Sequence, residues 1–433
     1  MKKKAQLYVL VPIIFFSVSG GPYGLEEIVS SIGPHFTLLL ILILPIIWTI
    51  PETFIVAELS STYPVQGGYY KWVQMGLGRF WGFMEGWWSI LYTLIDLSLY
   101  PILFTMYLKF LLPHLDFWAI YLVQLLMIWT CAIINILGIR FVGYILILFK
   151  IFILLCFALF IVLGLKHISF NFKEIFNLPR KYETSNLLFG LSLAFWNFIG
   201  WDNGSTILGE TEEPSNNYHK ALFITIPIIV FFYFFPILVG ACVHTNWQSW
   251  KFGEFSFVAN SMNHPLLAVL LAVGGMVACL GLFNSLLLSS TRVFSSMAED
   301  KLFPAFFAKM HVKFHTPYLA IIFSALVYSF LVLVNFKNLV IYNVFLYLMA
   351  MFLEALALYF LRKHNPKIKT NFKIPFGNLG MYCILFLACS VILFMILVNL
   401  FNLNSSVYDS MLSILFLVSG LPIYFWYKIN EKH

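Results

Sequence analysis

The amino-acid sequence predicts an all-α, polytopic membrane protein with about twelve transmembrane helices. Of its 433 residues, 61% are hydrophobic and only 10% are charged, and long apolar stretches follow one another along the chain. A soluble domain carries about 25% charged residues, and a disordered chain needs fewer hydrophobic residues and more charge. The composition therefore excludes a soluble globular enzyme and a disordered chain.

Charge and cysteine content limit the partners and cofactors that can be expected. The net charge of +7 comes from 26 Lys+Arg against 19 Asp+Glu, and the basic residues are dispersed rather than gathered in one stripe, which argues against a nucleic-acid partner. The six cysteines lie in apolar runs without a CxxC pair, so neither a disulfide framework, a metal site nor any other cofactor is predicted.

The boundaries of the predicted spans come from polar, charged or Gly/Pro-rich clusters that divide the apolar sequence. A spanning helix needs about 20 mostly apolar residues. The twelve candidates lie near 7–31, 35–62, 81–112, 117–136, 142–165, 185–210, 220–244, 265–290, 317–335, 339–362, 380–401 and 409–428. The first two are separated mainly by Ile32-Gly33-Pro34. All twelve are expected to form a single transmembrane domain over residues 1–433.

An even number of spans places both termini on the same side of the membrane. If the termini are inside, most Lys and Arg residues, including Lys2, Lys3 and the basic loop 362–373, fall on the cytoplasmic side. We therefore predict an integral protein of the cell membrane with cytoplasmic termini. Ordinary topogenesis explains the basic loop, and recognition of lipid headgroups is the alternative.

The first and sixth spans each contain a segment in which a continuous α-helix is costly. Residues 17–24 read Ser-Val-Ser-Gly-Gly-Pro-Tyr-Gly, and residues 195–204 contain two glycines four apart together with Asn197, Asp202 and Asn203. Free N–H groups at such breaks can bind carboxylates, and free C=O groups can bind ammonium groups or cations. A packing kink is the alternative for each break taken alone.

The two breaks occupy equivalent places if the first ten spans form two halves, 7–165 and 185–362, with 380–428 adding two helices. Because each half has five spans, the second half would start on the opposite side of the membrane, giving an inverted repeat. This arrangement predicts a binding site between the first and sixth spans.

Several acidic residues lie within the predicted spans, where an ionisable group costs at least ~2.5–3.5 kcal/mol. The candidates are Glu26, Glu52, Glu85, Asp96, Asp202 and Glu354. Only Lys150 lies at a depth that could neutralise them, so the spans suit a cationic substrate or a proton. The predicted proton-coupling residues are Glu26, Asp96, Lys150, Asp202 and Glu354.

Other interpretations of these residues stay open at this point. Glu85 and Glu354 could instead cap polar networks near the inner face. Lys150 could extend to the cytoplasm or act as a fixed cation near the first break. Trp196, beside the second break, could stack on an organic cation with about 0.5–2 kcal/mol.

Short sequence strings resemble the amino acid–polyamine–organocation superfamily of permeases, with the plant-type polyamine uptake permeases among the most similar. The strings occur in family order at 17–26, 51–58, 66–69, 82–87, 95–101, 195–202, 209–214, 295–304 and 372–375. The sequence departs from the polyamine permeases at Glu85, where they tend to have an amide, and at Lys150, where they lack a base.

The resemblance implies a five-plus-five inverted repeat with two extra helices and secondary active transport by alternating access. It also implies which residues line the substrate site. Ser19, Gly20 and Gly21 would contribute from the first break. Trp196 would contact the substrate, as a tryptophan does in the arginine–agmatine exchangers, and Ile199 and Gly200 would offer carbonyl groups.

Our functional hypothesis is a proton-coupled or exchanging transporter of amino acids or related amines, with cationic amino acids or polyamines favoured. The predicted substrate-binding residues are Ser19, Gly20, Gly21, Gly24, Glu26, Asp96, Trp196, Asn197, Ile199, Gly200, Trp201 and Asp202. A neutral amino acid exchanger of the same fold is the alternative. A membrane-embedded enzyme is disfavoured because the ten histidines lie in loops or near helix ends, and a channel would have polar rings along a pore and no inverted repeat.

Overall fold

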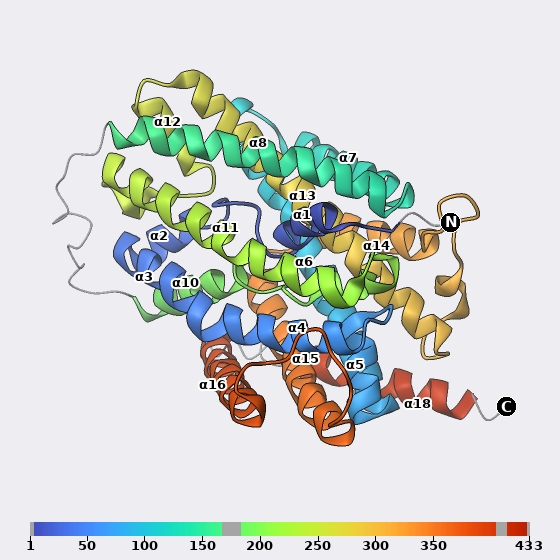
Figure 1. Ribbon diagram of the computed structural model, residues 1–433. Coiled ribbons are helices and arrows are strands. Elements are labelled where there is room, and N and C mark those ends of the chain that lie inside the picture. The colour runs from blue at the N-terminus through green and yellow to red at the C-terminus, as the bar shows by residue number, and fades with distance from the viewer. Residues whose placement is uncertain (1–3, 167–182, 404–413, 431–433) are drawn as a thin grey trace.

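The computed structural model describes residues 4–166, 183–403 and 414–430, and all regular elements in these ranges are helices. The long helices run side by side as a bundle (Figure 1). This confirms the all-α class. Lys2, Lys3 and the start of the predicted last span, 409–413, lie outside the described residues.

The helices can be followed in chain order in Figure 1. The α-helices are α1 (Leu7–Val18), α2 (Glu26–Ile32), α3 (Pro34–Leu44), α4 (Ile50–Thr62), α5 (Gly68–Leu77), α6 (Arg79–Leu111), α7 (Phe117–Ile136), α8 (Ile139–Leu165), α10 (Thr184–Trp196), α11 (Pro214–Val243), α12 (Glu254–Ser261), α13 (Pro265–Glu299), α14 (Tyr318–Leu331), α15 (Phe336–His364), α16 (Gly377–Leu403) and α18 (Gly420–Asn430). A π-helical turn, η1 (Pro45–Thr49), joins α3 to α4, and the 3₁₀ segments are η2 (Asn203–Glu210), η3 (Trp247–Ser249) and η4 (Ala305–Ala308).

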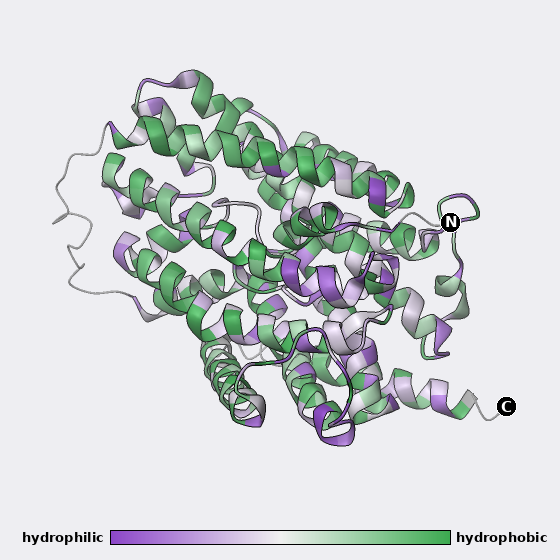
Figure 2. Ribbon diagram, viewed as in Figure 1, coloured by the Kyte–Doolittle hydropathy of each residue, from purple (hydrophilic) through white to green (hydrophobic). Residues whose placement is uncertain are grey.

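Eight helical segments are long and apolar enough to cross a membrane, and four shorter apolar helices accompany them in the described part of the chain. Each of the twelve predicted spans overlaps one of these helices. Large apolar side chains point outward from the peripheral helices, for example Trp118 on α7, Leu148 on α8 and Phe386 on α16. Hydrophobic residues dominate these helices along most of their length (Figure 2), as a surface facing hydrocarbon requires. The chain is an integral membrane protein; the count of twelve crossings stays a prediction.

The boundary between the first two predicted spans lies where the sequence placed it. α2 ends at Ile32, Gly33 adopts φ +82°, and α3 begins at Pro34. Glycine accepts this positive φ without steric cost, and proline at the first helical position loses no backbone hydrogen bond. The chain therefore turns here rather than continuing one helix.

The helices differ from the predicted boundaries in three places. α13 continues to Glu299, beyond the predicted end at 290, because the serines and Arg292 that follow are buried against protein instead of lipid. The second half of the sixth span is the 3₁₀ segment η2 rather than an α-helix. Finally, α5 and α12 form in connections between spans, where hydropathy gives no signal for a helix.

The centre of the bundle is built around α6, which packs along α13 and α15. α1 packs against α8, α11 and α13, so the end of α1 lies in the middle of the protein. The chain enters α1 and leaves α18 at the same end of the bundle, on the right of Figure 1. The side of the membrane on which this end lies stays a prediction, and so does the inverted repeat.

Candidate functional site

The first predicted break is present: seven residues, 19–25, separate α1 from α2. Gly21 (φ +81°) and Gly24 (φ +95°) both adopt conformations that favour glycine. The hydroxyl of Ser19 accepts a hydrogen bond from the Gly21 amide at 3.0 Å, and the Gly24 amide donates to the Glu26 carboxylate at 2.8 Å. Side chains thus replace part of the missing helical hydrogen bonding.

The second break lies between α10 and η2, over residues 197–202. Gly200 has φ +101°, and its amide donates to the hydroxyl of Tyr347 at 3.0 Å. The next amide, that of Trp201, donates to the Glu52 carboxylate at 3.2 Å. The freed backbone groups of this break therefore bind side chains from α4 and α15.

The two breaks face each other in the middle of the bundle. A Cβ atom at Gly200 would lie 2.4 Å from the carbonyl oxygen of Ser17, and one at Gly24 would lie 3.2 Å from the amide oxygen of Asn197. The approach at Gly200 leaves no room for a side chain, and the approach at Gly24 would require Asn197 to shift. The sequence pattern had indicated both breaks, and their proximity is a property of the fold.

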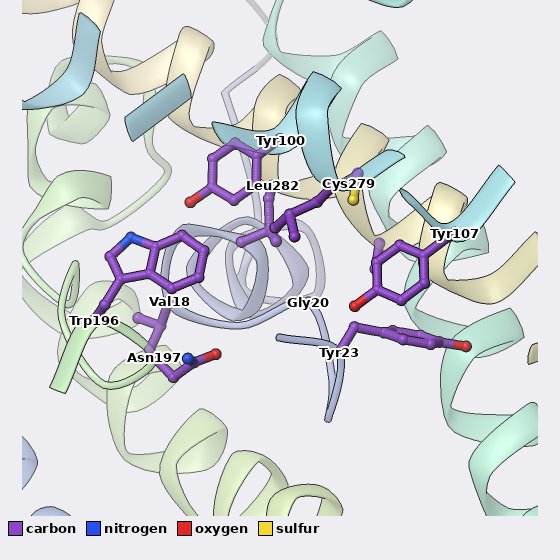
Figure 3. Close-up of a pocket in the computed structure, with 11 residues that line it drawn as sticks. Val18, Gly20, Tyr23, Tyr100, Tyr107, Trp196, Asn197, Cys279 and Leu282 are labelled. Carbon is purple, nitrogen blue, oxygen red and sulfur yellow. The ribbon is translucent and has the colours of Figure 1, made fainter. Parts of the chain in front are cut away.

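Two small pockets lie at the breaks. The first is lined by Val18, Gly20, Tyr23, Tyr100, Leu103, Tyr107, Trp196, Asn197, Ala278, Cys279 and Leu282. The second is lined by Ser17, Val18, Tyr92, Asp96, Tyr100, Trp196, Ile199, Gly200, Asn203, Asn343 and Tyr347. Figure 3 shows the first pocket, with Trp196 and Asn197 on one side and Tyr23 and Tyr107 on the other. Each has a volume of about 20 Å³, enough for a water molecule, so this conformation is closed around the site.

Asp96 is the acidic residue that lines the second pocket, and neutral donors hold its carboxylate. The Trp196 indole nitrogen donates to one oxygen at 2.7 Å, and the Tyr100 hydroxyl donates to the other at 2.8 Å. The two rings stack with centroids 6.1 Å apart. Asp96 is 8% exposed and makes no ion pair among the described residues. An anion held at the edges of two stacked aromatic rings is a chemical environment that suits an organic cation.

The residues predicted from the first break divide into two groups. Gly20 lines the first pocket. Gly21 instead packs toward Ile153 of α8, and Ser19 caps its own turn. Gly24 lies against the second break.

Glu26 does not line either pocket. Its fully buried carboxylate accepts hydrogen bonds from the amides of Gly24 and Gly253, the second at 3.3 Å, with the Tyr107 hydroxyl nearby. These contacts tie the start of α2 to the start of α12. The structure therefore places Glu26 as a backbone acceptor, apart from Asp96.

The residues predicted from the second break are also distributed unevenly. Trp196, Asn197, Ile199 and Gly200 line the pockets. The Trp201 indole points away and donates to the carbonyl of Phe198 at 3.1 Å. Asp202 accepts a hydrogen bond from Tyr347 at 2.7 Å and lines neither pocket. It lies among other buried acids.

Four buried acids from four elements gather around Tyr347 and Tyr69; we name this group the carboxyl cluster. Its members are Glu52 of α4, Glu85 of α6, Asp202 at the start of η2 and Glu354 of α15. The sequence had identified all four as intramembrane acids without indicating that they meet. Glu354 and Asp202 were predicted coupling residues, and a local polar network was the alternative for both Glu354 and Glu85.

Lys150 of α8 is partly buried, lines neither pocket and forms no ion pair with a described acid. Its predicted role in coupling is therefore not supported by a direct contact with the acids of the site.

Sequence reasoning missed the tyrosines. Tyr92, Tyr100 and Tyr347 line the second pocket, and each donates a hydrogen bond within it or to the carboxyl cluster. In a chain with 22 tyrosines no single one stands out. The spacing of Tyr92, Asp96 and Tyr100 was the available signal, because residues four apart share one face of a helix.

Ion pairs close the bundle at the end where the chain enters α1. Arg292 of α13 pairs with Glu210 of η2 at 2.9 Å, and Lys71 of α5 pairs with Asp300 at 2.5 Å. The amide of Ala5 donates to the Glu210 carbonyl at 2.8 Å. These contacts connect the segment before the first break and the segment after the second break to α13, and so they close this end of the bundle.

Comparison with known proteins identifies the family. The amino acid permease family matches residues 12–421 of the chain. The chain belongs to this family. It is therefore a membrane transporter and not an enzyme, in agreement with the resemblance found in the sequence strings.

Similar proteins include transporters of plants and bacteria. A probable polyamine transporter of Arabidopsis thaliana is 33% identical over 396 residues, covering 90% of this chain and 79% of the relative. The polyamine transporter PUT1 of Oryza sativa subsp. japonica is 32% identical over 397 residues, with 89% and 72% covered. The serine/threonine exchanger SteT of Bacillus subtilis is 25% identical over 402 residues, with 88% and 86% covered.

Proposed function

We propose that the chain is a secondary active transporter that carries a cationic amino acid or polyamine across the cell membrane by alternating access. The observation that carries the proposal is the Asp96 carboxylate, which accepts hydrogen bonds from the stacked side chains of Trp196 and Tyr100 at two facing helix breaks. The similarity to plant polyamine transporters supports the same substrate class.

A substrate ammonium group would take the place of one neutral donor on Asp96. A hydrogen bond between two charged partners is stronger than the neutral bonds that Asp96 makes in the closed state. The rings of Trp196 and Tyr100 would then lie beside the cation, where the ring face adds about 0.5–2 kcal/mol. Binding would require the two pockets to merge by rotation of the Trp196 side chain, which lines both.

Alternating access requires that the seal at one end opens while the other closes. In this proposal α1–α8 and α10–α15 are the two halves of the inverted repeat, both termini are cytoplasmic, and the Arg292–Glu210 pair closes the cytoplasmic end. A proton gradient or a counter-substrate drives the cycle.

A neutral amino acid exchanger is the second candidate, and one observation favours it. No described residue accepts a hydrogen bond from the amide of Gly20, which lines the first pocket. An α-carboxylate could bind there, as free amides at a helix break allow. The bacterial serine/threonine exchanger is similar over most of this chain.

Uptake into proteoliposomes tests the proposal. Purified wild-type protein, Asp96→Asn and a control, Glu254→Gln, would be compared with radiolabelled putrescine, spermidine, arginine and serine. Glu254 is a buried acid outside the pockets that pairs with His244. We expect saturable uptake of at least one cationic compound, reduced at least about tenfold by Asp96→Asn and little changed by Glu254→Gln.

Three outcomes would overturn this assignment. Serine uptake without cation uptake would favour the second candidate. Equal cation uptake by the wild type and by Asp96→Asn would show that Asp96 does not bind the substrate. A steady ionic current without saturation would indicate a channel.

A further inference from the structure

The carboxyl cluster has four buried acids and no basic partner in the described part of the chain. Glu52, Glu85, Asp202 and Glu354 are each at most 2% exposed. None forms an ion pair with a described Lys, Arg or His. The other titratable side chains that face them are Tyr69 of α5, Tyr92 of α6, Tyr218 of α11 and Tyr347 of α15. A buried charge without a partner is strongly disfavoured in a membrane protein, so four carboxylates cannot coexist here.

The hydrogen bonds of Tyr347 also require a proton on the carboxyl cluster, without any electrostatic argument. The Tyr347 hydroxyl contacts one oxygen of Glu52 and one of Asp202, and it accepts the Gly200 amide. A hydroxyl has a single hydrogen and can donate to only one carboxylate. At least one of the two acids must therefore carry a proton in order to complete the second contact.

Asp202 and Glu354 give a second case of two acceptors in contact. Their carboxyl groups are close enough to act directly on each other. Neither Glu354 oxygen has a donor among the described residues, and one oxygen of Glu52 and one of Glu85 likewise have none. A proton on Glu354 or Asp202 turns this contact between two acceptors into a hydrogen bond.

An independent group also points into the cluster. The Tyr69 hydroxyl is fully buried, and Asp202, Glu85 and Glu354 are among the groups that act on it electrostatically. This hydroxyl has no hydrogen-bond partner within the usual distance and angle limits, and its near neighbour is the hydroxyl of Tyr92. It is available as a donor to a carboxylate that has lost its proton.

The geometry points to the carboxyl cluster as the proton-binding site of the transporter. The cluster is protonated in the closed state and releases a proton when the cytoplasmic end opens. This inference rests on the proposed function. In the release step, the O–H bond of a carboxyl group breaks, its proton passes to water and a carboxylate remains. The cluster is linked to the substrate site because Tyr347, which holds two of its acids, also lines the pocket of Asp96 and binds the second break.

Release would favour opening through repulsion between the acids. The four carboxyls come from α4, α6, η2 and α15, so a gain of negative charge pushes these elements apart. η2 carries Glu210, which pairs with Arg292 at the sealed end. Movement of η2 would therefore disturb the seal, which couples proton release to access from the cytoplasm.

The experiment compares Glu354→Gln and Asp202→Asn with wild type and with Glu254→Gln as the control. Each variant is isosteric with a protonated acid, so the closed state should fold. Two transport modes are measured in proteoliposomes with the substrate that the wild type accepts. One is uptake driven by an imposed pH gradient, and the other is substrate exchange at equal pH on both sides.

For wild type and Glu254→Gln we expect the pH gradient to stimulate uptake by about fivefold or more. Glu354→Gln and Asp202→Asn should lose this stimulation and keep exchange within about twofold of wild type. A lumenal pH dye should report proton entry with substrate only in the first two proteins. Infrared spectra should show a protonated carboxyl band at neutral pH that weakens in Glu354→Gln.

The outcomes separate the failure of this inference from failure of the proposed function. Full stimulation by the pH gradient in both cluster variants would overturn the inference, as would a sodium gradient that replaces the proton gradient. An infrared band unchanged by Glu354→Gln would also overturn it. Absence of exchange in the wild type for every amine or amino acid tested would instead overturn the proposed function.

Discussion

Two groups of buried acids lie within one bundle, and their surroundings differ in the supply of hydrogen-bond donors. Asp96 is alone and receives two neutral donors, one for each oxygen. The carboxyl cluster has four acids, and several of its oxygens have no donor among the described residues. A carboxylate with two donors can remain an anion ready for a cation, whereas acids that share donors need protons to satisfy one another. Residues of the same kind at neighbouring sites can therefore have different tasks.

The largest expected effect comes from substituting Gly200, which lies where the pocket of Asp96 and the carboxyl cluster meet. In Gly200→Ala the new Cβ would lie 2.4 Å from the Ser17 carbonyl oxygen at φ +101°. We expect loss of transport and a destabilisation of at least about 1–3 kcal/mol, measured by uptake and by thermal unfolding of the purified protein. Gly78→Ala is the control, with φ +92° and no atom within 4 Å of the new Cβ. Equal behaviour of the two variants would contradict the close packing of the breaks.

Tyr347→Phe should affect the cluster more than the substrate site. It removes the hydroxyl shared by Glu52 and Asp202 and leaves the Gly200 amide without a partner. An unsatisfied buried group costs about 1–3 kcal/mol, so thermal stability should fall and the response to a pH gradient should weaken. Full gradient stimulation at wild-type stability would show that the cluster does not depend on this hydroxyl.

Trp196→Phe should affect the substrate site alone. The change keeps a ring beside Tyr100 but removes the hydrogen bond to Asp96 and part of the aromatic face. The substrate concentration for half-maximal uptake should rise about three- to tenfold, with the relative stimulation by a pH gradient unchanged. Trp201→Phe is the matched control, because Trp201 lines neither pocket. A larger change in the control would place the substrate elsewhere.

The smallest effect is expected at Asp300, an acid that forms an ion pair with Lys71. Burial alone would raise the pKa of Asp300, but hydrogen bonds from Lys71 and Tyr70 outweigh burial and hold the pKa below its ordinary value of 3.8. A lowered pKa stabilises the folded state at pH values above the ordinary value, and this contribution disappears as pH falls through the lowered pKa. Asp300→Asn should cost about 1 kcal/mol or less near neutral pH, and the difference from wild type in thermal unfolding should vanish in strong acid. A difference independent of pH would show that the effect is not ionic.

The residues of the two regions were not equally predictable. Gly33-Pro34 and the glycines of both breaks could be recognised because their backbone requirements are local: positive φ, or a missing amide, excludes a continuous helix whatever surrounds it. Asp96 could be selected because an acid in a long apolar helix is costly wherever that helix packs. In contrast, the tyrosines gave no signal, since their donors matter only beside an acid from another element.

The sequence by itself determined the class of the protein, the positions of its spans and the two interruptions in them, because hydrophobicity and backbone geometry act over a few neighbouring residues. Only the tertiary structure decided which acids share a site. It turned Glu26 toward the amides of Gly24 and Gly253, left Asp96 between two aromatic donors, and brought Glu354 next to Asp202. Hydrogen bonds reach about 3 Å, so the chemistry of a carboxyl depends on residues that are distant in sequence and meet only when the helices pack.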